Sequence, residues 1–290
     1  MRVTLVYHHA AGQGLSAGWL RQELERAGHQ VVRVLDGPAC LASADLSAID
    51  LVVAAGGDGT IARTATALAG RDLPLAILPL GTANNIARSL GIDGTTAELI
   101  AAWPDAQPRP LDLGVARGGF GAAAFAEGIG GGFIPRSIAL FDIDAPEIGE
   151  PPPDRVRRAL SRYREVLAKL RPRCWTLTVD GTSLTGDYLL VEVLNIRSVG
   201  ANVVLAPTAD ASDGWLDVVT VADDQRAALD DHLAALLAGT SATLTLPTRR
   251  AARVDTEGWT DMHIDDRLLA GTEIEAVSIE VQPAALRYLA

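Results

Sequence analysis

Apolar and polar residues alternate with two different periods along the first third of the chain. Four short apolar runs are typical of β-strands, and the run at 51–55 is apolar at every position, as in a strand buried on both faces. Between these runs apolar residues recur at helical spacing, and Ser16 and Gly28 are placed to begin and end the first helix. The predicted strands are 2–7, 30–35, 51–55 and 75–78, with helices over about 16–27, over 61–68 and from residue 83 onward. Alternating strands and helices with short loops predict βαβ units and a parallel sheet.

The pattern changes after about residue 110. Short strand-like stretches separated by Gly and Asp turns are typical of an antiparallel, all-β region. The predicted strands are 115–117, 175–180, 188–195, 215–221, 243–246, 252–255, 262–264 and 273–281, with helices near 154–170 and 225–237. We therefore expect a domain boundary between residues 110 and 120.

Composition excludes several classes of protein. The 290 residues carry 25 Lys+Arg against 36 Asp+Glu, a net charge of −11, which argues against an extended nucleic-acid surface. The two cysteines, Cys40 and Cys174, form neither a disulfide framework nor a cysteine zinc site. No targeting segment or transmembrane run is evident, so a cytoplasmic protein is expected. Lys169 is the single lysine, which excludes a Walker-type loop and a kinase lysine on a strand.

A glycine-rich loop, Gly-Gly-Asp-Gly-Thr at 56–60, follows the buried strand and opens a helix. Glycines let the backbone turn sharply and expose its amides, and the helix N-terminus adds partial positive charge. Such a loop can bind phosphate without a lysine. An ordinary strand-to-helix turn explains these five residues equally well, because Asp-Gly is common in turns.

A second loop, Pro-Leu-Gly-Thr-Ala-Asn-Asn at 79–85, also follows an apolar strand and opens a helix. Two helix caps would explain single residues of this run but not all of it. Loops at the carboxyl ends of parallel strands face one crevice, where open α/β sheets bind ligands. The pair of loops therefore predicts nucleotide or phosphate binding.

GGDGT, followed some twenty residues later by LPLGTANNIARSLGI, resembles the catalytic domain of the diacylglycerol kinase family. This family comprises bacterial lipid kinases to which sphingosine and ceramide kinases are related. FAEGIG at 125–130, the segment 195–218 and the ending 263–289 resemble the family's β-rich half. The resemblance thus covers nearly the whole chain through several separated motifs.

The resemblance implies an α/β plus all-β fold, with a Rossmann-like N-terminal domain that binds ATP and Mg²⁺ and a C-terminal β-sandwich that admits the lipid. We expect these domains at 1–115 and 116–282, and a return of residues 283–290 to the first domain is left open. The reaction would be transfer of the γ-phosphoryl group to a lipid hydroxyl, such as that of diacylglycerol, with Asp58 a catalytic candidate. The implied cofactor-binding residues are Gly56, Gly57, Asp58, Gly59, Thr60, Gly81, Thr82 and Asn84.

Three carboxylates crowd the eight residues 210–217. Oxygen ligands at this density can hold Mg²⁺ or Ca²⁺, often together with backbone carbonyls. The family resemblance implies a metal here, with Asp213 as the carboxylate ligand and the carbonyls of Asp210 and Trp215 beside it. A solvated Asp-Gly turn is the alternative.

Three positions depart from the family pattern. His8-His9 replaces the usual Asn-Pro after the first strand, and Leu35-Asp36 stands where relatives often have a threonine. Relatives also carry Asp-Gly-Glu or Asp-Asp-Glu near the C-terminus as the source of the general base, whereas this chain has Asp265-Asp266-Arg267. Arginine cannot accept a proton at neutral pH. Asp265 is then the base, or the chemistry differs, or kinase activity is lost.

The segment 154–173 is a basic island whose apolar residues fall on one helical face. Such a helix docks on anionic membrane or packs on its own domain. We expect a cytoplasmic lipid kinase, peripheral to the membrane when it meets its substrate, with a homodimer left open. The alternatives are a non-catalytic nucleotide- or lipid-binding relative and a kinase of a soluble substrate.

Overall fold

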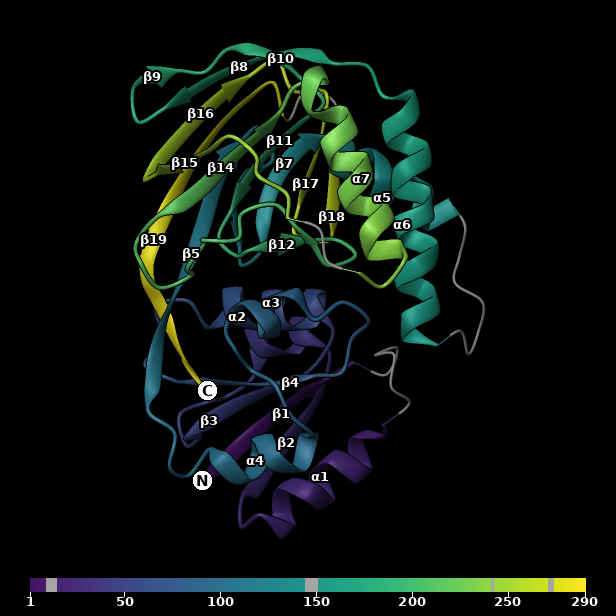
Figure 1. Cartoon of the computed structure of the whole chain (residues 1–290). Helices are drawn as coiled ribbons and strands as arrows, with labels where there is room; N and C mark the ends of the chain where they lie inside the picture. The colour runs from purple at the N-terminus through teal and green to yellow at the C-terminus, as the bar shows by residue number, and fades with distance from the viewer. Residues whose placement is uncertain (9–14, 144–150, 241–242, 271–273) are drawn as a thin grey trace.

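The computed structural model describes residues 1–8, 15–143, 151–240, 243–270 and 274–290, and side chains at 141–143 and 270 are outside this description. Two bodies are stacked in Figure 1, the N-terminal one below and the β-rich one above, with two long strands running between them. Within the described residues, no helix is long and apolar enough to cross a membrane.

The lower body is a parallel sheet between two layers of helices, as the alternating pattern predicts. Its strands are β1 (Arg2–Tyr7), β2 (Gln30–Asp36), β3 (Leu51–Gly56) and β4 (Leu75–Pro79), in the order β4-β3-β1-β2. Its helices are α1 (Ala17–Arg26), η1 (Pro38–Ser43, a 3₁₀ helix), α2 (Asp58–Leu68), α3 (Asn85–Ser89) and α4 (Thr96–Ala102). Ser16 caps α1, since its Oγ accepts a hydrogen bond from the Trp19 N–H at 3.1 Å.

Successive residues of the buried strands pack in different hydrophobic cores, one on each face of the sheet, because side chains alternate across a strand. Val53 and Ala55 pack with α1 and α4, whereas Val52 and Ala54 pack with α2 and α3. All six residues of β3 are buried for this reason. Helix α2 begins at Asp58, three residues before the predicted start, because Gly57 serves as its N-cap.

The upper body contains two antiparallel sheets, which confirms the predicted β-sandwich. The first consists of β5 (Pro108–Gly118), β6 (Gly121–Phe125), β8 (Arg173–Val179), β9 (Thr182–Ser183), β10 (Gly186–Tyr188), β16 (Arg253–Glu257) and β19 (Ala276–Leu289). The second consists of β7 (Gly128–Gly132), β11 (Leu190–Leu194), β14 (Leu216–Val221), β15 (Thr248–Ala251), β17 (Asp261–Ile264) and β18 (Arg267–Ala270). A small ribbon pairs β12 (Ser198–Val199) with β13 (Val203–Val204).

Glycines in β7 make room for large side chains from both sides. A Cβ on Gly131 would overlap the ring of Trp175, which stacks edge to face on Trp259 at 5.1 Å between the sheets. A Cβ on Gly130 would overlap the buried carboxyl group of Glu192. Strand β7 is therefore glycine-rich because it lies between bulky neighbours.

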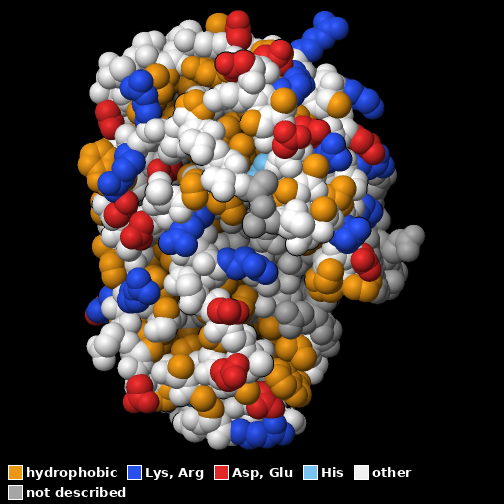
Figure 2. Space-filling view, in the orientation of Figure 1, with side chains coloured by type: hydrophobic (Ala, Val, Ile, Leu, Met, Phe, Trp, Pro, Cys, Tyr) orange, Lys and Arg blue, Asp and Glu red, His pale blue; other side chains and the backbone are white. Residues whose placement is uncertain are grey.

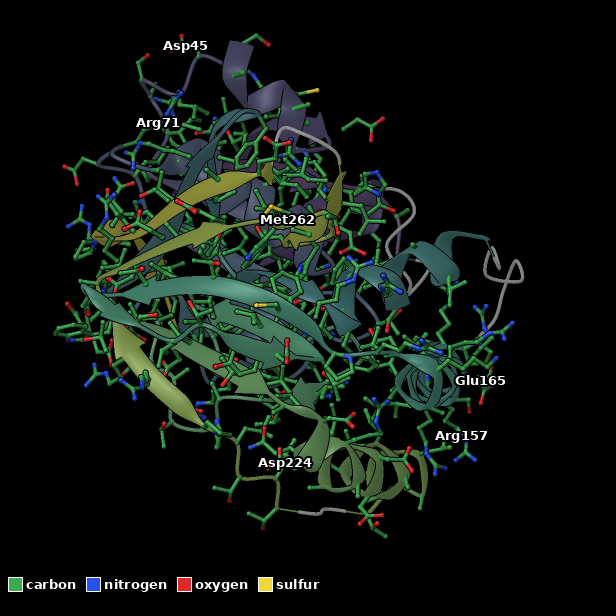
Figure 3. The ribbon with its side chains drawn as sticks, turned by 90° about the horizontal axis from the view of Figure 1, so that it is seen from above. Asp45, Arg71, Arg157, Glu165, Asp224 and Met262 are labelled. Atoms are coloured by element: carbon green, nitrogen blue, oxygen red, sulfur yellow. The ribbon has the colours of Figure 1, made fainter. Side chains whose placement is uncertain are left out.

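Three helices cover the outer face of the second sheet: α5 (Phe133–Ile143), α6 (Pro152–Lys169) and α7 (Arg226–Leu237), the last preceded by η2 (Asp223–Gln225). Leu160, Tyr163 and Leu167 of α6 are buried against this sheet and α7. Packing within its own domain thus accounts for the apolar face of the basic segment. Figure 3 shows Arg157 and Glu165 on the outer side of α6, and on the face seen in Figure 2 basic and acidic side chains are interspersed.

Residues 243–246 were predicted as a strand, but they are irregular in the structure. Leu244 and Leu246 are buried in the core beneath α6 and α7. Their alternating apolar pattern reflects this packing rather than pairing in a sheet. The prediction of strand 243–246 is therefore wrong.

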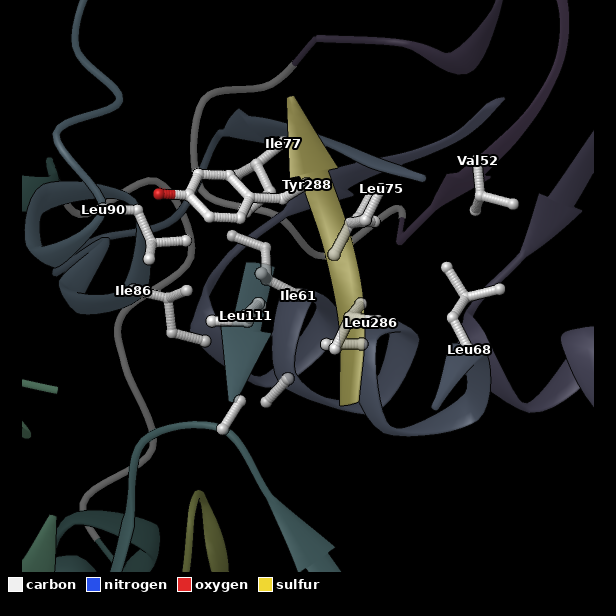
Figure 4. Packing of buried hydrophobic residues seen from close by; sticks show 14 of the residues in the cluster. Val52, Ile61, Leu68, Leu75, Ile77, Ile86, Leu90, Leu111, Leu286 and Tyr288 are labelled. Carbon is white, nitrogen blue, oxygen red and sulfur yellow. The ribbon is translucent and has the colours of Figure 1, made fainter. Parts of the chain in front are cut away.

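Strands β5 and β19 link the two bodies by pairing along both (Figure 1). Ala284, in the left-handed region at φ 47°, bends β19, and its N–H donates to Asp112 Oδ1 at 2.6 Å. Beyond this bend Tyr288 pairs with Leu75 of β4 in parallel. Figure 4 shows Leu286 and Tyr288 packed among N-terminal residues such as Leu75 and Ile77.

Candidate active site

The two glycine loops are in direct backbone contact at the carboxyl ends of β3 and β4. The Leu80 N–H donates to the Gly56 carbonyl at 2.9 Å. A Cβ on Gly81 would lie well under 3.0 Å from the Cα of Gly57. The sequence predicted that both loops face one crevice. In the structure the loops touch each other, and only glycine at position 81 leaves room for this contact.

Gly81→Ala is expected to destabilise the fold by about 1–3 kcal/mol, the usual cost of overpacking a tight contact. Urea unfolding of the variant measures this loss. Gly18→Ala is the matched control, because position 18 lies within α1 and the nearest atom to the added Cβ would be Ser16 Oγ, at 3.9 Å. Equal midpoints for the G81A and G18A variants would contradict the contact.

Asp58 connects the first loop to the second. Its Oδ1 accepts a hydrogen bond from the Ile86 N–H at 3.0 Å, at the start of α3. Burial raises the pKa of Asp58, although the backbone N–H groups of 84–86 oppose this effect. Asp58 therefore places a half-buried carboxyl group at the point where the two loops meet.

The other predicted loop residues have different positions. Thr82 lines the cavity between the two bodies, whereas Thr60 is buried against Gly56. Asn84 closes its own loop: its Oδ1 accepts from the Gly81 N–H at 2.8 Å, and its Nδ2 donates to the Gly81 carbonyl. The roles assigned to Thr60 and Asn84 in nucleotide binding stay predictions.

The next residue, Asn85, links the bodies. Its Nδ2 donates to the Gly200 carbonyl at 2.9 Å, and its Oδ1 accepts from the Ser198 hydroxyl at 3.0 Å. Asn85 is buried and lines the same cavity as Asp58 and Thr82. The second loop is therefore fixed to the β-rich body by its last residue.

Asp265 and Asp266 form the two-residue turn between β17 and β18. The Asp265 carboxylate accepts three backbone N–H bonds, from Ala126, Glu127 and Gly128, at 3.2, 2.8 and 3.3 Å. Burial raises the pKa of Asp265 to about 6, although these N–H groups oppose the rise. Asp265 thus joins the β17–β18 turn to the start of β7.

Asp266 and Arg267 face different surroundings from Asp265. Asp266 approaches Gly59 at the N-terminus of α2 and pairs with Arg63 at 2.7 Å. Arg267 is exposed and is not among the residues that line the cavity. The arginine at the family's glutamate position therefore adds no positive charge to the cavity lining.

The cavity has a volume of about 450 Å³ and two unlike walls. One wall is polar, with side chains from the two loops, the β17–β18 turn and Glu127. The other is mostly apolar and comes from α5, α6 and the ribbon that starts with β12. Ile138, Val156, Ala159, Val199 and Ala201 line it, together with Arg155 and Tyr163 of α6. A molecule with a polar group and an apolar body fits both walls.

A second cavity of about 550 Å³ lies beside the ends of β1 and β2 and the outer face of α2. His8 and Asp36, two of the positions that depart from the family pattern, line it together with Arg63. His9 lies outside the described residues. Because Arg63 pairs with Asp266 of the first cavity, the two cavities are neighbours at this ion pair.

The segment predicted to bind a divalent cation is already engaged in protein contacts. Asp213 Oδ2 pairs with Arg250, and its Oδ1 accepts from the Trp215 N–H at 3.0 Å. Asp210 Oδ1 accepts from the backbone and hydroxyl of Ser212. Across the described part of the chain, no group of three or more His, Cys, Asp or Glu side chains is arranged to hold a metal. Both oxygens of Asp213 are therefore engaged by protein partners in this structure, and a metal site made of Asp213 with the carbonyls of Asp210 and Trp215 stays a prediction.

Two acidic residues near the cavity escaped the sequence analysis. Glu127 lines the cavity between β6 and β7, and Glu192 lies behind it on β11, paired with His263. The sequence did contain one signal for them: each is a single carboxylate within an otherwise apolar stretch. Carboxylates are rarely buried unless they have a partner, so such a position indicates a specific role. His263 is buried, and its Nδ1 lies 2.8 Å from the Asp265 carbonyl.

The protein has two domains: a parallel α/β domain and a β-sandwich. The two glycine loops of the first domain face the second across a cavity with one polar and one apolar wall. This arrangement defines the lipid-kinase fold class. Residues 2–116 match the family model of the diacylglycerol kinase catalytic domain, and residues 153–290 match that of the YegS C-terminal NAD kinase beta sandwich-like domain.

Individual relatives agree with these matches. The diacylglycerol kinase of Mycobacterium tuberculosis is 30% identical over 241 residues, which cover 79% of this chain and 75% of that protein. A probable YegS-like lipid kinase of Pseudomonas aeruginosa is 32% identical over 243 residues, or 81% and 75% of the two chains. The crystal structure of a putative diacylglycerol kinase from Bacillus anthracis has the same fold, with a TM-score of 0.75 at 19% identity over 99% of this chain and 97% of that one. The chain belongs to the diacylglycerol kinase family.

Proposed function

We propose that this protein transfers the γ-phosphoryl group of ATP to the hydroxyl group of a lipid such as diacylglycerol. The observation that carries the proposal is the cavity whose polar wall includes Asp58, Thr82 and Asn85 and whose opposite wall is apolar. A lipid acceptor satisfies both walls at once, since its hydroxyl group needs polar partners and its acyl chains need apolar surface. A soluble, polar acceptor would leave the apolar wall without a binding partner.

The nucleotide is placed along the outer face of α2. Backbone amides at its N-terminus, beside Gly57 and Gly59, suit the phosphates. The second cavity, with His8, Asp36 and Arg63, offers room for the nucleoside. In this arrangement the γ-phosphate points toward the acceptor cavity, because the two cavities adjoin at the Arg63–Asp266 pair.

The basic surface of α6 is proposed to face the membrane during turnover. Its apolar residues are committed to the protein core, so attraction to anionic headgroups rather than insertion would hold it there. Arg157, on the outer side of the helix in Figure 3, belongs to this surface. If this surface binds membranes, the protein should bind anionic vesicles, and the binding should weaken as the salt concentration rises.

The test of the proposed function is phosphorylation by the purified protein of labelled lipid in mixed micelles with ATP and Mg²⁺. Diacylglycerol, monoacylglycerol, ceramide and phosphatidylglycerol are offered separately. Asp58→Ala is expected to lower transfer at least about 100-fold, because it removes the carboxyl group that joins the two loops and leaves the buried Ile86 N–H without its partner.

Asp105→Ala is the matched control, since residue 105 is exposed in the turn after α4. It should retain wild-type transfer. Binding of ATP without transfer to any lipid would support the non-catalytic alternative, and no binding of ATP would refute the proposal.

A further inference from the structure

Four carboxyl groups meet at the polar wall of the cavity, and three of them are committed to other partners. Asp58 accepts from the Ile86 N–H, Asp265 accepts from three backbone N–H groups, and both oxygens of Asp266 accept from Arg63 at 2.9 and 2.7 Å. Each of these carboxylates therefore accepts at least one hydrogen bond that links separate segments of the chain.

The fourth carboxyl group, that of Glu127, differs. It is 7% exposed, and no described residue exchanges a hydrogen bond with its Oε1. A buried polar atom without a partner costs free energy and is rare unless a ligand completes it. Since Glu127 lines the cavity, a bound acceptor can provide that partner.

The backbone of Glu127 is held firmly in place. Its N–H donates to Asp265 Oδ1 at 2.8 Å, and its carbonyl accepts from the Asn195 N–H at 2.8 Å. The Asn85 side chain faces the Glu127 carboxyl group from the second glycine loop. The unpartnered oxygen is therefore fixed between the phosphate loops and the apolar wall.

From this placement, and given the lipid kinase activity proposed above, we infer that Glu127 is the general base for the acceptor hydroxyl group. Its carboxylate takes the hydroxyl proton as the hydroxyl oxygen bonds to the γ-phosphorus of ATP. The bond from that phosphorus to the β–γ bridging oxygen breaks, and its electron pair leaves with ADP. Glu127 then loses the proton to solvent, so the step balances without another reactant.

The charges around Glu127 suit this task. Burial first, and then the negative charges of Asp58 and Asp265, raise its pKa well above the ordinary range, although Asn85 opposes this rise. A carboxylate whose pKa moves toward the working pH is a stronger proton acceptor. The titratable groups that interact with it electrostatically are Asp58, Asp265, Asp266 and Tyr163, and the charged Arg155 lines the same cavity.

The inference explains how a chain with Arg267 in place of the expected glutamate keeps a base. Arg267 is exposed and outside the cavity lining, whereas Glu127 lines the cavity from the connection just before β7, the strand that pairs with β17. Asp265, the base suggested by the sequence, also lines the cavity, but its carboxylate accepts three hydrogen bonds from the backbone N–H groups of residues 126–128.

The experiment compares Glu127→Gln with wild type in the micelle assay, using the lipid that wild type phosphorylates. The variant is expected to lose about 10²–10⁴-fold in kcat/KM, the usual worth of a general base, while ATP affinity measured by calorimetry stays within about twofold. Glu257→Gln, on an exposed position of β16, is the matched control and should keep wild-type activity.

The pH profile separates Glu127 from Asp265. Wild-type kcat/KM should rise with pH as Glu127 loses its proton. This rise should vanish in Glu127→Gln. It should remain in Asp265→Asn, even if that variant is slower than wild type at every pH. A rise that disappears only in Asp265→Asn would assign the base to Asp265 and overturn the inference. So would activity of Glu127→Gln within threefold of wild type.

Stability gives a readout that does not depend on activity. The raised pKa in the folded state means that folded protein holds the Glu127 proton more tightly than the unfolded chain does, so stability falls as pH rises from about 4.5 through the folded pKa. Glu127→Gln mimics the protonated form and should lack this fall, so that it melts no lower than wild type at pH 8. A lower melting temperature would indicate a structural role instead. If wild type itself phosphorylates no lipid, the proposed function fails first, and this stability comparison still tests the placement of Glu127.

Discussion

Removal of residues 283–290 is expected to unfold the N-terminal domain. Leu286 and Tyr288 are each only 2% exposed, and they lie in the core that α2 and α3 form with the parallel sheet (Figure 4). Deleting one such side chain from a core costs about 2–5 kcal/mol. Losing both, together with the strand that pairs with β4, approaches the whole stability of a domain, about 5–15 kcal/mol.

Circular dichroism and amide hydrogen exchange of the truncated chain measure this loss, with protection of β1 and β3 as the local readout. Deleting only Ala290 is the control, because this terminal residue is exposed and lies beyond β19. Native exchange protection in the chain that ends at residue 282 would contradict the expectation. The nucleotide loops would then be shown to form without the C-terminal segment.

The parallel sheet could be predicted from the sequence, because strands buried on both faces are continuous apolar runs. Strand β1 has the predicted bounds, and β3 differs by one residue, since each is a continuous apolar run between turn residues. The end of β19 shows no such run. Its residues beyond the bend at Ala284 are few, and the strand they pair with is far away in sequence, since Tyr288 pairs with Leu75. Local pattern carries no information over such a separation.

The candidate site divides in the same way. The two glycine loops could be predicted, because glycine between a strand and a helix is a local signal with a backbone cause. Glu127, Glu192 and His263 could not, because their roles depend on which strands become neighbours: β7 lies between β11 and β17 in the sheet. Sequence spacing does not encode that order, so the structure was needed to bring these three side chains to one place.

His263→Ala is expected to lower the free energy of unfolding by about 3–5 kcal/mol, the cost of removing one partner from a buried ion pair. The Nε2 atom of His263 lies 3.0 Å from Glu192 Oε2, and both side chains are fully buried. With the imidazole gone, the Glu192 carboxyl group stays in the interior without its partner. Urea unfolding at pH 6 measures the loss, and His232→Ala, which removes another buried histidine, is the control expected to show a smaller effect.

The pH dependence of this pair has a defined sign. Burial lowers the pKa of His263, but the Glu192 carboxylate and the Asp265 carbonyl outweigh burial, so the pKa is raised above 6.5. A raised pKa of a base means that its stabilisation is complete below about 6.5 and is lost as pH rises through the folded value. The difference in unfolding free energy between wild type and His263→Ala should therefore shrink from pH 6 toward alkaline pH. A constant or growing difference would show that His263 is not protonated in the fold.

The same pair also determines where Asp265 lies, and stability and activity should therefore separate. The Nδ1–H of His263 donates to the Asp265 carbonyl at 2.8 Å, which supports the turn that joins Asp265 to the backbone N–H of Glu127. Replacing both His263 and Glu192 with leucine removes the buried charges together, and such exchanges are often neutral for stability. The double variant should fold but transfer phosphate more slowly, because the Asp265 carbonyl then loses its imidazole donor and the β17–β18 turn is held against β7 only by the remaining backbone bonds. Full activity in a stable double variant would confine the pair to a role in folding.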